Sequence, residues 1–123
     1  MEDMRAQQIE ALEVLEDYNN RLMKSMKNII PELEGDRKED TDKFLDEIVK
    51  GINWEIGILN GTMTLLNEKE ERINKEDINS SILKLSQALE GKNDSEIAAS
   101  LKDTLPVFEK FGKAAGEVLE EVK

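Results

Sequence analysis

Cysteine and histidine are both absent from the 123-residue chain, and their absence excludes several kinds of chemistry. A chain without cysteine has no disulfide, no thiol nucleophile and no cysteine-ligated metal. A chain without histidine cannot form the Glu-x-x-His pairs through which di-iron helical bundles hold their metals. Because the sequence also has no catalytic serine motif and no glycine-rich phosphate loop, we expect no catalytic, cofactor-binding or metal site.

Proline, glycine and long apolar runs are also scarce. The chain has two prolines and seven glycines, a low content that is typical of helical proteins. No apolar run approaches the roughly 18 residues that a membrane span needs. The first residues include Glu2 and Asp3, unlike the basic and apolar start of a signal peptide. We therefore expect no membrane insertion and a cytoplasmic location.

Charge is abundant and mostly negative. The chain has 28 acidic and 17 basic residues, a net charge of -11, and no run of Lys or Arg. Such a chain repels a phosphate backbone, so we expect no nucleic-acid partner. Hydrophobic residues still make up 38% of the sequence, enough for one core. Residues 1–123 are therefore expected to fold as a single domain.

Helical periodicity dominates the remaining pattern. Apolar residues recur at intervals of three and four, which places them on one face of an α-helix. Two such segments, joined near Gly35, predict a first helical hairpin over about residues 3–67. Two more, joined near Gly91, predict a second hairpin over about residues 75–122. The expected fold class is all-α, an antiparallel four-helix bundle.

Several helix boundaries are marked by residues with capping preferences. Asn74 and Asn93 each precede an acidic residue by three positions, the spacing of a helix N-terminal cap. Gly91 is placed to end the third helix in left-handed geometry. Asp36 can cap the second helix, with Glu39 as the returning partner of a capping box, and Thr41 or Asp40 are the alternative caps.

The two predicted hairpins resemble each other. Leu33-Glu34-Gly35 recurs as Leu89-Glu90-Gly91, and in both copies the next core leucine lies twelve residues on, at Leu45 and Leu101. A duplicated hairpin would give this pattern. The offset of 56 residues is also eight heptads, so any two heptad stripes would align once the leucines do. Duplication is therefore one of two explanations.

Carboxylate pairs at helical spacing are the feature that favours an enzyme. Glu13-x-x-Glu16 and Glu39-x-x-Asp42 resemble the strings through which all-α nucleotide pyrophosphohydrolases hold magnesium. Most of these carboxylates fall outside the apolar stripes, where charge usually only solvates a helix. We therefore interpret them as solvated, with a magnesium-dependent pyrophosphohydrolase as the alternative.

The single tryptophan, Trp54, lies off the main apolar stripe. Tryptophan is enriched at binding hot spots and is also a common core residue, and we interpret Trp54 as part of the core, with a hot spot as the alternative. Gly51, Gly57 and Gly61 lie within the second helix. Close packing of a neighbouring helix is the favoured explanation for these glycines, and local flexibility is the other.

The unequal lengths of the predicted helices suggest an interaction site. The third helix is the shortest, so one end of the bundle should lack its fourth helix and expose apolar side chains. The alternatives are that residues 67–73 fold across this end, or that frayed termini leave nothing there to bind. We predict that a partner helix or a second copy of the chain binds there, through Ile9, Leu12, Leu15, Met63, Leu66, Leu119 and Val122.

Three segments, Leu33-Glu34-Gly35-Asp36, Gly51-Ile52-Asn53-Trp54 and Leu105-Pro106-Val107-Phe108, carry a resemblance to a group of small acidic bacterial proteins. These are helical proteins of uncharacterised function, some of them described as chaperones. In size and acidity the chain is also similar to flagellar and type III export chaperones, a likeness of architecture that assigns no residues. The leading functional hypothesis is a non-enzymatic protein-binding module, an adaptor or export-type chaperone whose partner lays a helix into an apolar groove. A homo-oligomeric structural protein, such as a homodimer, is the other non-enzymatic hypothesis.

Overall fold

The computed structural model describes residues 4–122, and within them the chain forms four α-helices and no strand. The helices are α1 (Met4–Leu33), α2 (Thr41–Leu66), α3 (Lys75–Gly91) and α4 (Asp94–Val122). The all-α four-helix bundle predicted from the periodicity is confirmed, and α3 is the shortest helix. None of these helices is both long and apolar enough to cross a membrane.

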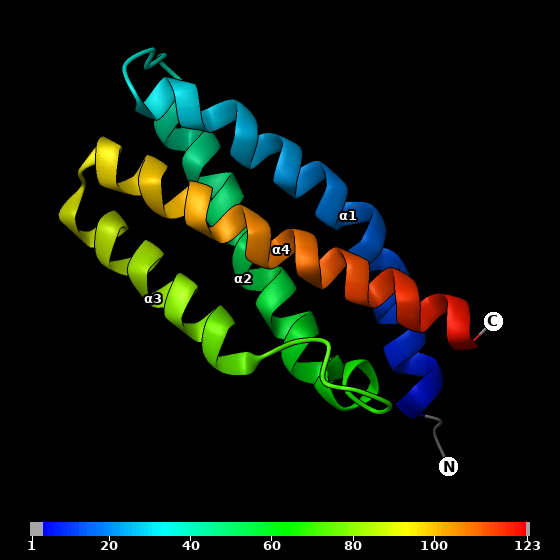
Figure 1. Cartoon of the computed structure of the whole chain (residues 1–123). Helices are drawn as coiled ribbons and strands as arrows, with labels where there is room; N and C mark the ends of the chain where they lie inside the picture. The colour runs from blue at the N-terminus through cyan, green and yellow to red at the C-terminus, as the bar shows by residue number, and fades with distance from the viewer. Residues whose placement is uncertain (1–3, 123) are drawn as a thin grey trace.

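Figure 1 shows how the helices are arranged. Helix α4 runs through the middle of the molecule, with α1 along one side, α3 along the other and α2 behind. Helix α1 packs against α2 and α4, whereas α3 packs against α4. Over residues 4–122, α2 approaches α4 only briefly, and its backbone makes no contact with α3. Helix α2 therefore depends on α1 for most of its packing.

The core consists of two clusters of buried side chains. The first includes Met26, Ile29 and Leu101 and lies toward the turns that join α1 to α2 and α3 to α4. The second includes Leu12 and Leu119 and lies toward the start of α1 and the end of α4. The buried positions of α1, α2 and α4 recur at intervals of three and four, as they do in helices that pack side by side along their length.

Asparagine caps begin the last two helices, as predicted. The Oδ1 atom of Asn74 accepts hydrogen bonds from two backbone amides in the first turn of α3, at 2.8 and 3.3 Å. Asn93 accepts one from the amide of Glu96 in α4, at 3.1 Å. The prediction for Gly91 is wrong, because Gly91 remains helical and Lys92 takes the left-handed conformation, with φ at 53°.

The two hairpin turns differ in length and geometry. Residues 34–40 join α1 to α2, whereas Lys92 and Asn93 alone join α3 to α4. Positive φ falls on Gly35 in the first turn and on Lys92 in the second. Helix α2 starts at Thr41, so Asp40, one of the alternatives to Asp36, takes the cap position. Turn length therefore gives no support to a duplicated hairpin, and only the shared Leu-Glu-Gly string remains in its favour.

Candidate functional site

The end of the bundle that was predicted to be open is covered by the segment between α2 and α3. Ile73 of this segment is buried in the second core cluster. Asn67 holds the segment in place, since its Oδ1 atom accepts hydrogen bonds from the backbone amides of Arg72 and Ile73, at 2.9 and 3.1 Å. Its Nδ2 atom donates to the backbone oxygen of Ile73 at 3.1 Å. The alternative in which residues 67–73 fold across this end is the one observed.

Arg72 fastens this segment to α4. Its side chain is only 7% exposed. The guanidinium donates hydrogen bonds to the backbone oxygen of Leu66 at 3.2 Å, to Glu117 at 3.4 Å and to Glu121 at 2.6 Å. A largely buried guanidinium with several charged and polar partners fixes a loop more firmly than a surface ion pair does.

The structure corrects the geometry of the predicted partner groove. Four of the seven predicted residues are in the core and at most 3% exposed: Leu12, Leu15, Leu66 and Leu119. The other three are partly buried against the second cluster: Ile9, Met63 and Val122. The four leucines share their cluster with Ile73, which the segment between α2 and α3 adds to the core at this end. Binding of a partner at this end stays a prediction.

The carboxylate pairs considered for magnesium lie far apart. Glu13 and Glu16 are in the first half of α1, whereas Glu39 and Asp42 lie beyond its other end, next to the start of α2. Residues 16–33 of α1 span about 25 Å, at 1.5 Å per residue. Asp42 is instead paired with Arg37 at 2.7 Å, and this hydrogen bond lowers the pKa of the Asp42 carboxyl. As arranged here, the two pairs cannot share one metal ion.

A buried polar layer separates the two core clusters. Asn19 of α1 is 2% exposed, and Glu55 of α2 is completely buried. Each lies between a residue of the first cluster and a residue of the second, one turn away on either side. The flanking core residues are Leu22 and Leu15 on α1, and Ile52 and Leu59 on α2.

Asn19 has only part of its hydrogen-bonding capacity satisfied. Its Nδ2 atom donates to the backbone oxygen of Phe108 on α4 at 3.0 Å and approaches the sulfur of Met23 at 3.4 Å. Gly112 makes this approach possible, because a Cβ atom at that position would lie 2.5 Å from Nδ2. The buried Oδ1 atom of Asn19 has no hydrogen-bond donor in the part of the chain that is described.

Glu55 is the most unusual side chain of the core. Neither of its carboxyl oxygens has a hydrogen-bond partner among residues 4–122. Burial raises the pKa of the Glu55 carboxyl to about 8, so this group is mostly protonated and uncharged at neutral pH. The buried residues Thr62 and Thr104 differ, since each donates to a backbone oxygen of its own helix at 2.7 Å.

An aromatic pair, one member of which is exposed, lies on the outer side of the polar layer. Tyr18 immediately precedes Asn19, and Trp54 immediately precedes Glu55. Their ring centroids are 5.0 Å apart at an interplanar angle of 75°, an edge-to-face contact. Trp54 is 42% exposed, so its interpretation as a core residue is wrong: it packs edge to face against Tyr18 and keeps much of its surface in solvent.

Val14 extends this surface along α1 and is 52% exposed. Val14, Tyr18 and Trp54 surround a shallow, mostly apolar hollow of about 410 Å³. We call these three residues the aromatic patch. Glu47 and Lys50 of α2 border the hollow. The patch is thus an apolar surface with charged neighbours, built by two helices.

The three glycines of α2 have different roles. A Cβ atom at Gly51 would collide with the phenol oxygen of Tyr18 and would lie 3.0 Å from a methyl carbon of Leu22, so close packing is confirmed there. At Gly57 and Gly61 an added Cβ would meet no atom of the described residues within 4 Å. The close-packing explanation is therefore wrong for these two positions.

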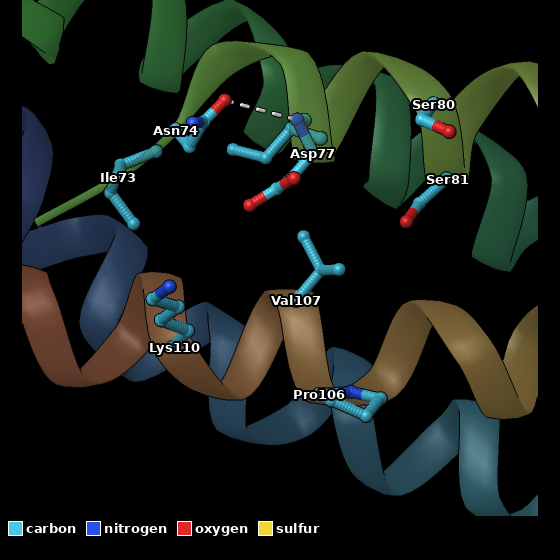
Figure 2. Close-up of a pocket in the computed structure, with 9 residues that line it drawn as sticks. Ile73, Asn74, Asp77, Ser80, Ser81, Pro106, Val107 and Lys110 are labelled. Carbon is cyan, nitrogen blue, oxygen red and sulfur yellow. Dashed lines mark hydrogen bonds between the residues drawn. The ribbon is translucent and has the colours of Figure 1, made fainter.

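A second hollow, of about 380 Å³, lies between α3 and α4. Figure 2 shows Asp77, Ser80 and Ser81 of α3 on one side of it, and Val107 and Lys110 of α4 on the other. Within residues 4–122, none of the residues around this hollow has a buried polar side-chain atom without a partner. The polar layer does have such atoms, and we therefore take it, with the aromatic patch above it, as the candidate site.

Sequence reasoning misses Glu55 and Asn19 because it assigns core positions to apolar residues only. On α2 the apolar residues Ile56 and Met63 are partly buried, whereas the buried positions one residue earlier are Glu55 and Thr62. A strict three-and-four spacing from Ile48 would have placed Glu55 in the core.

A family model described as a domain of unknown function, DUF8042, matches residues 10–114. The matched range includes the aromatic patch, Asn19 and Glu55. No curated protein and no solved structure matches the chain. The resemblance to proteins of uncharacterised function is confirmed at this level. With most of its length covered by the match, the chain belongs to the DUF8042 family.

Proposed function

We propose that the chain is a non-enzymatic protein-binding module, an adaptor or chaperone-like protein whose partner docks on the aromatic patch. The observation that carries this proposal is the exposure of Val14 and Trp54 beside one hollow, on two neighbouring helices. Aromatic side chains anchor protein interfaces because they bury a large area with few rotatable bonds. The proposal keeps the cytoplasmic location expected from the sequence.

Charge indicates what kind of partner fits. The chain carries a net charge of -11. Near the patch, Asp17 is paired with Arg21 at 2.7 Å and Asp46 with Lys50 at 3.1 Å. Glu47 borders the hollow and forms no ion pair with any residue between 4 and 122. The proposed occupant is therefore a segment of another protein with apolar anchors flanked by Lys or Arg, whose charges complement this acidic rim.

A second copy of the chain fits the patch less well. Two copies would each contribute a net charge of -11, and a symmetric contact through the hollow would bring the Glu47 side chains of both copies to the same interface. Like charges placed against each other weaken association. Self-association at the covered end of the bundle also has less support, because the leucines at that end are already buried.

An enzymatic function has less support than binding. The magnesium-dependent pyrophosphohydrolase alternative needs the carboxylate pairs of α1 and α2 to converge, and these pairs lie about 25 Å apart along α1. Asp42 is also engaged by Arg37. The proposal is therefore built on the aromatic patch, where apolar exposure and unpaired acidic charge occur together.

Selection from a random peptide-display library against the immobilised chain tests the proposal. We expect enrichment of peptides that combine apolar residues with Lys or Arg, and weaker binding as the salt concentration rises. Trp54→Ala and Val14→Glu should each abolish the enrichment. Leu83→Glu is the matched control, since Leu83 is an apolar residue of α3 with 59% exposure that does not border the hollow. Enrichment of acidic peptides, or equal capture by all variants, would contradict the proposal.

A further inference from the structure

Within residues 4–122, the buried side-chain acceptors that lack a hydrogen-bond donor all belong to one layer of the bundle. They are Oδ1 of Asn19 and the two carboxyl oxygens of Glu55. The residues just before them, Tyr18 and Trp54, are in ring contact at 5.0 Å, which puts both helices at the same level here. A protonated carboxyl has one O–H group that can donate a hydrogen bond, and an amide oxygen can accept it. The two unsatisfied groups are therefore complementary when Glu55 carries a proton.

An ionised Glu55 would find no compensating charge. Helices α1 and α4 are the ones that pack against α2. The titratable residues of α1 and α4 near this level are Glu16, Asp17, Tyr18, Arg21, Glu109, Lys110 and Lys113, and α2 itself adds Glu47 and Lys50. All are exposed except Tyr18, which is partly buried and faces Gly51. Because a buried charge without a partner is costly, ionisation of Glu55 favours a state in which its carboxylate reaches water.

Helix α2 is the element that can yield. It is held mainly by α1, and in the described part of the chain its backbone makes no contact with α3. Gly57 and Gly61 follow Glu55 within two turns, at positions where packing does not require glycine. Glycine weakens a helix relative to alanine, so this stretch of α2 loosens more readily than an alanine-rich one would.

We infer that Asn19 and Glu55 form a proton-dependent latch, in which the protonated Glu55 carboxyl donates to Asn19 Oδ1, directly or through one water. When Glu55 loses this proton to solvent, the middle of α2 is released from α1 and α4. Release moves Trp54 away from Tyr18 and so disrupts the aromatic patch. The latch is a property of the bundle itself and does not require the partner proposed above.

Amide hydrogen exchange of the full chain between pH 6 and pH 8 tests the latch. The closed state carries one proton more than the released state, so the protection factors of residues 55–62 should fall about tenfold per pH unit. Glu55→Gln is neutral at every pH and should remove this dependence. Glu47→Gln makes the same change at an exposed position of α2 and should behave as the wild type.

Two outcomes of this experiment would overturn the inference. One is an identical pH dependence in the wild type and in Glu55→Gln. The other is an equal protection factor in α2 and α3 at every pH, which would mean that the whole bundle opens and not α2 alone. Without histidine and cysteine, no other side-chain type ordinarily titrates between pH 6 and 8.

Carboxyl carbon NMR of the wild type keeps the inference testable if Glu55→Gln does not fold. A glutamate resonance that titrates near pH 8 supports the latch. Titration of every glutamate in the ordinary acidic range overturns it.

Discussion

The Nδ2 atom of Asn19 donates a hydrogen bond across 3.0 Å to the backbone oxygen of Phe108, and this bond joins α1 to α4 at the level of the polar layer. Within an α-helix the same oxygen is also the partner of the amide four residues later, which here belongs to Gly112. Asn19 therefore approaches α4 at a residue that has no side chain. The polar layer therefore requires glycine at position 112 in addition to the side chains of Asn19 and Glu55.

Gly112→Ala should lower the free energy of unfolding by about 1–3 kcal/mol, because the new Cβ would lie only 2.5 Å from Asn19 Nδ2. Urea denaturation is the measurement. The double variant Gly112→Ala with Asn19→Ala is the control, since it removes the clashing group and should recover part of the loss. An unchanged midpoint in Gly112→Ala would mean that Asn19 is free to move aside.

Alanine substitution at Gly57 or Gly61 of α2 should have the opposite effect on stability. Gly57→Ala and Gly61→Ala should each raise the free energy of unfolding by about 0.5–1 kcal/mol, since each new methyl group meets no neighbour and restricts the unfolded chain. Gly51→Ala is the matched control and should destabilise the bundle, because its Cβ would collide with Tyr18. Equal effects at the three positions would contradict this explanation of the glycines.

Stability should fall with rising pH because of Glu55. Its pKa is raised from 4.5 to about 8 in the folded chain. The stability that depends on the protonated carboxyl is therefore complete below pH 4.5 and is lost as the pH rises through about 8. Between pH 6.0 and 7.5 the free energy of unfolding should drop by about 2 kcal/mol, at about 1.4 kcal/mol per pH unit.

Urea denaturation at the two pH values, with Glu55→Gln beside the wild type, is the measurement. The glutamine variant should have the same stability at both values and should exceed the wild type at pH 7.5. A drop of the same size in both proteins would assign the pH dependence to another group.

Structural features that depend on residues close in sequence could be predicted from the sequence. The caps at Asn74 and Asn93 depend on residues two or three positions away, and the helices depend on apolar spacing within one segment. The exposure of Trp54 depends instead on which helices pack against α2. No local pattern shows that the backbone of α3, over the described residues, stays out of contact with α2.

The covering of one end of the bundle and the burial of Glu55 depend on residues that are distant from each other in the sequence. Arg72 bonds to Glu117 and Glu121, more than forty residues away, and these bonds, together with the burial of Ile73, hold residues 67–73 across the end. Glu55 looks like any other acidic residue of an acidic helix unless its position is counted strictly in heptads. The charge pattern alone would place Glu55 on the surface, whereas the packing of the helices places it in the core.

Arg72→Met should destabilise the bundle and free the segment between α2 and α3. The substitution keeps much of the aliphatic volume and removes the hydrogen bonds to Leu66, Glu117 and Glu121. Loss of these largely buried, charge-assisted bonds should lower the free energy of unfolding by about 1–2 kcal/mol. Urea denaturation gives this value, and limited proteolysis should show new cleavage within residues 67–73.

Arg21→Met is the control for Arg72→Met, because the ion pair of Arg21 with Asp17 is 74% and 71% exposed. It should change stability by less than about 0.5 kcal/mol. If the two variants behave alike, Arg72 does not hold the segment. If Arg72→Met opens the segment, Leu12, Leu66 and Leu119 become exposed, and the predicted partner groove at this end can be tested in its open form. A gain in self-association of this variant, absent from Arg21→Met, would then show that the apolar end binds a second copy once its cover is removed.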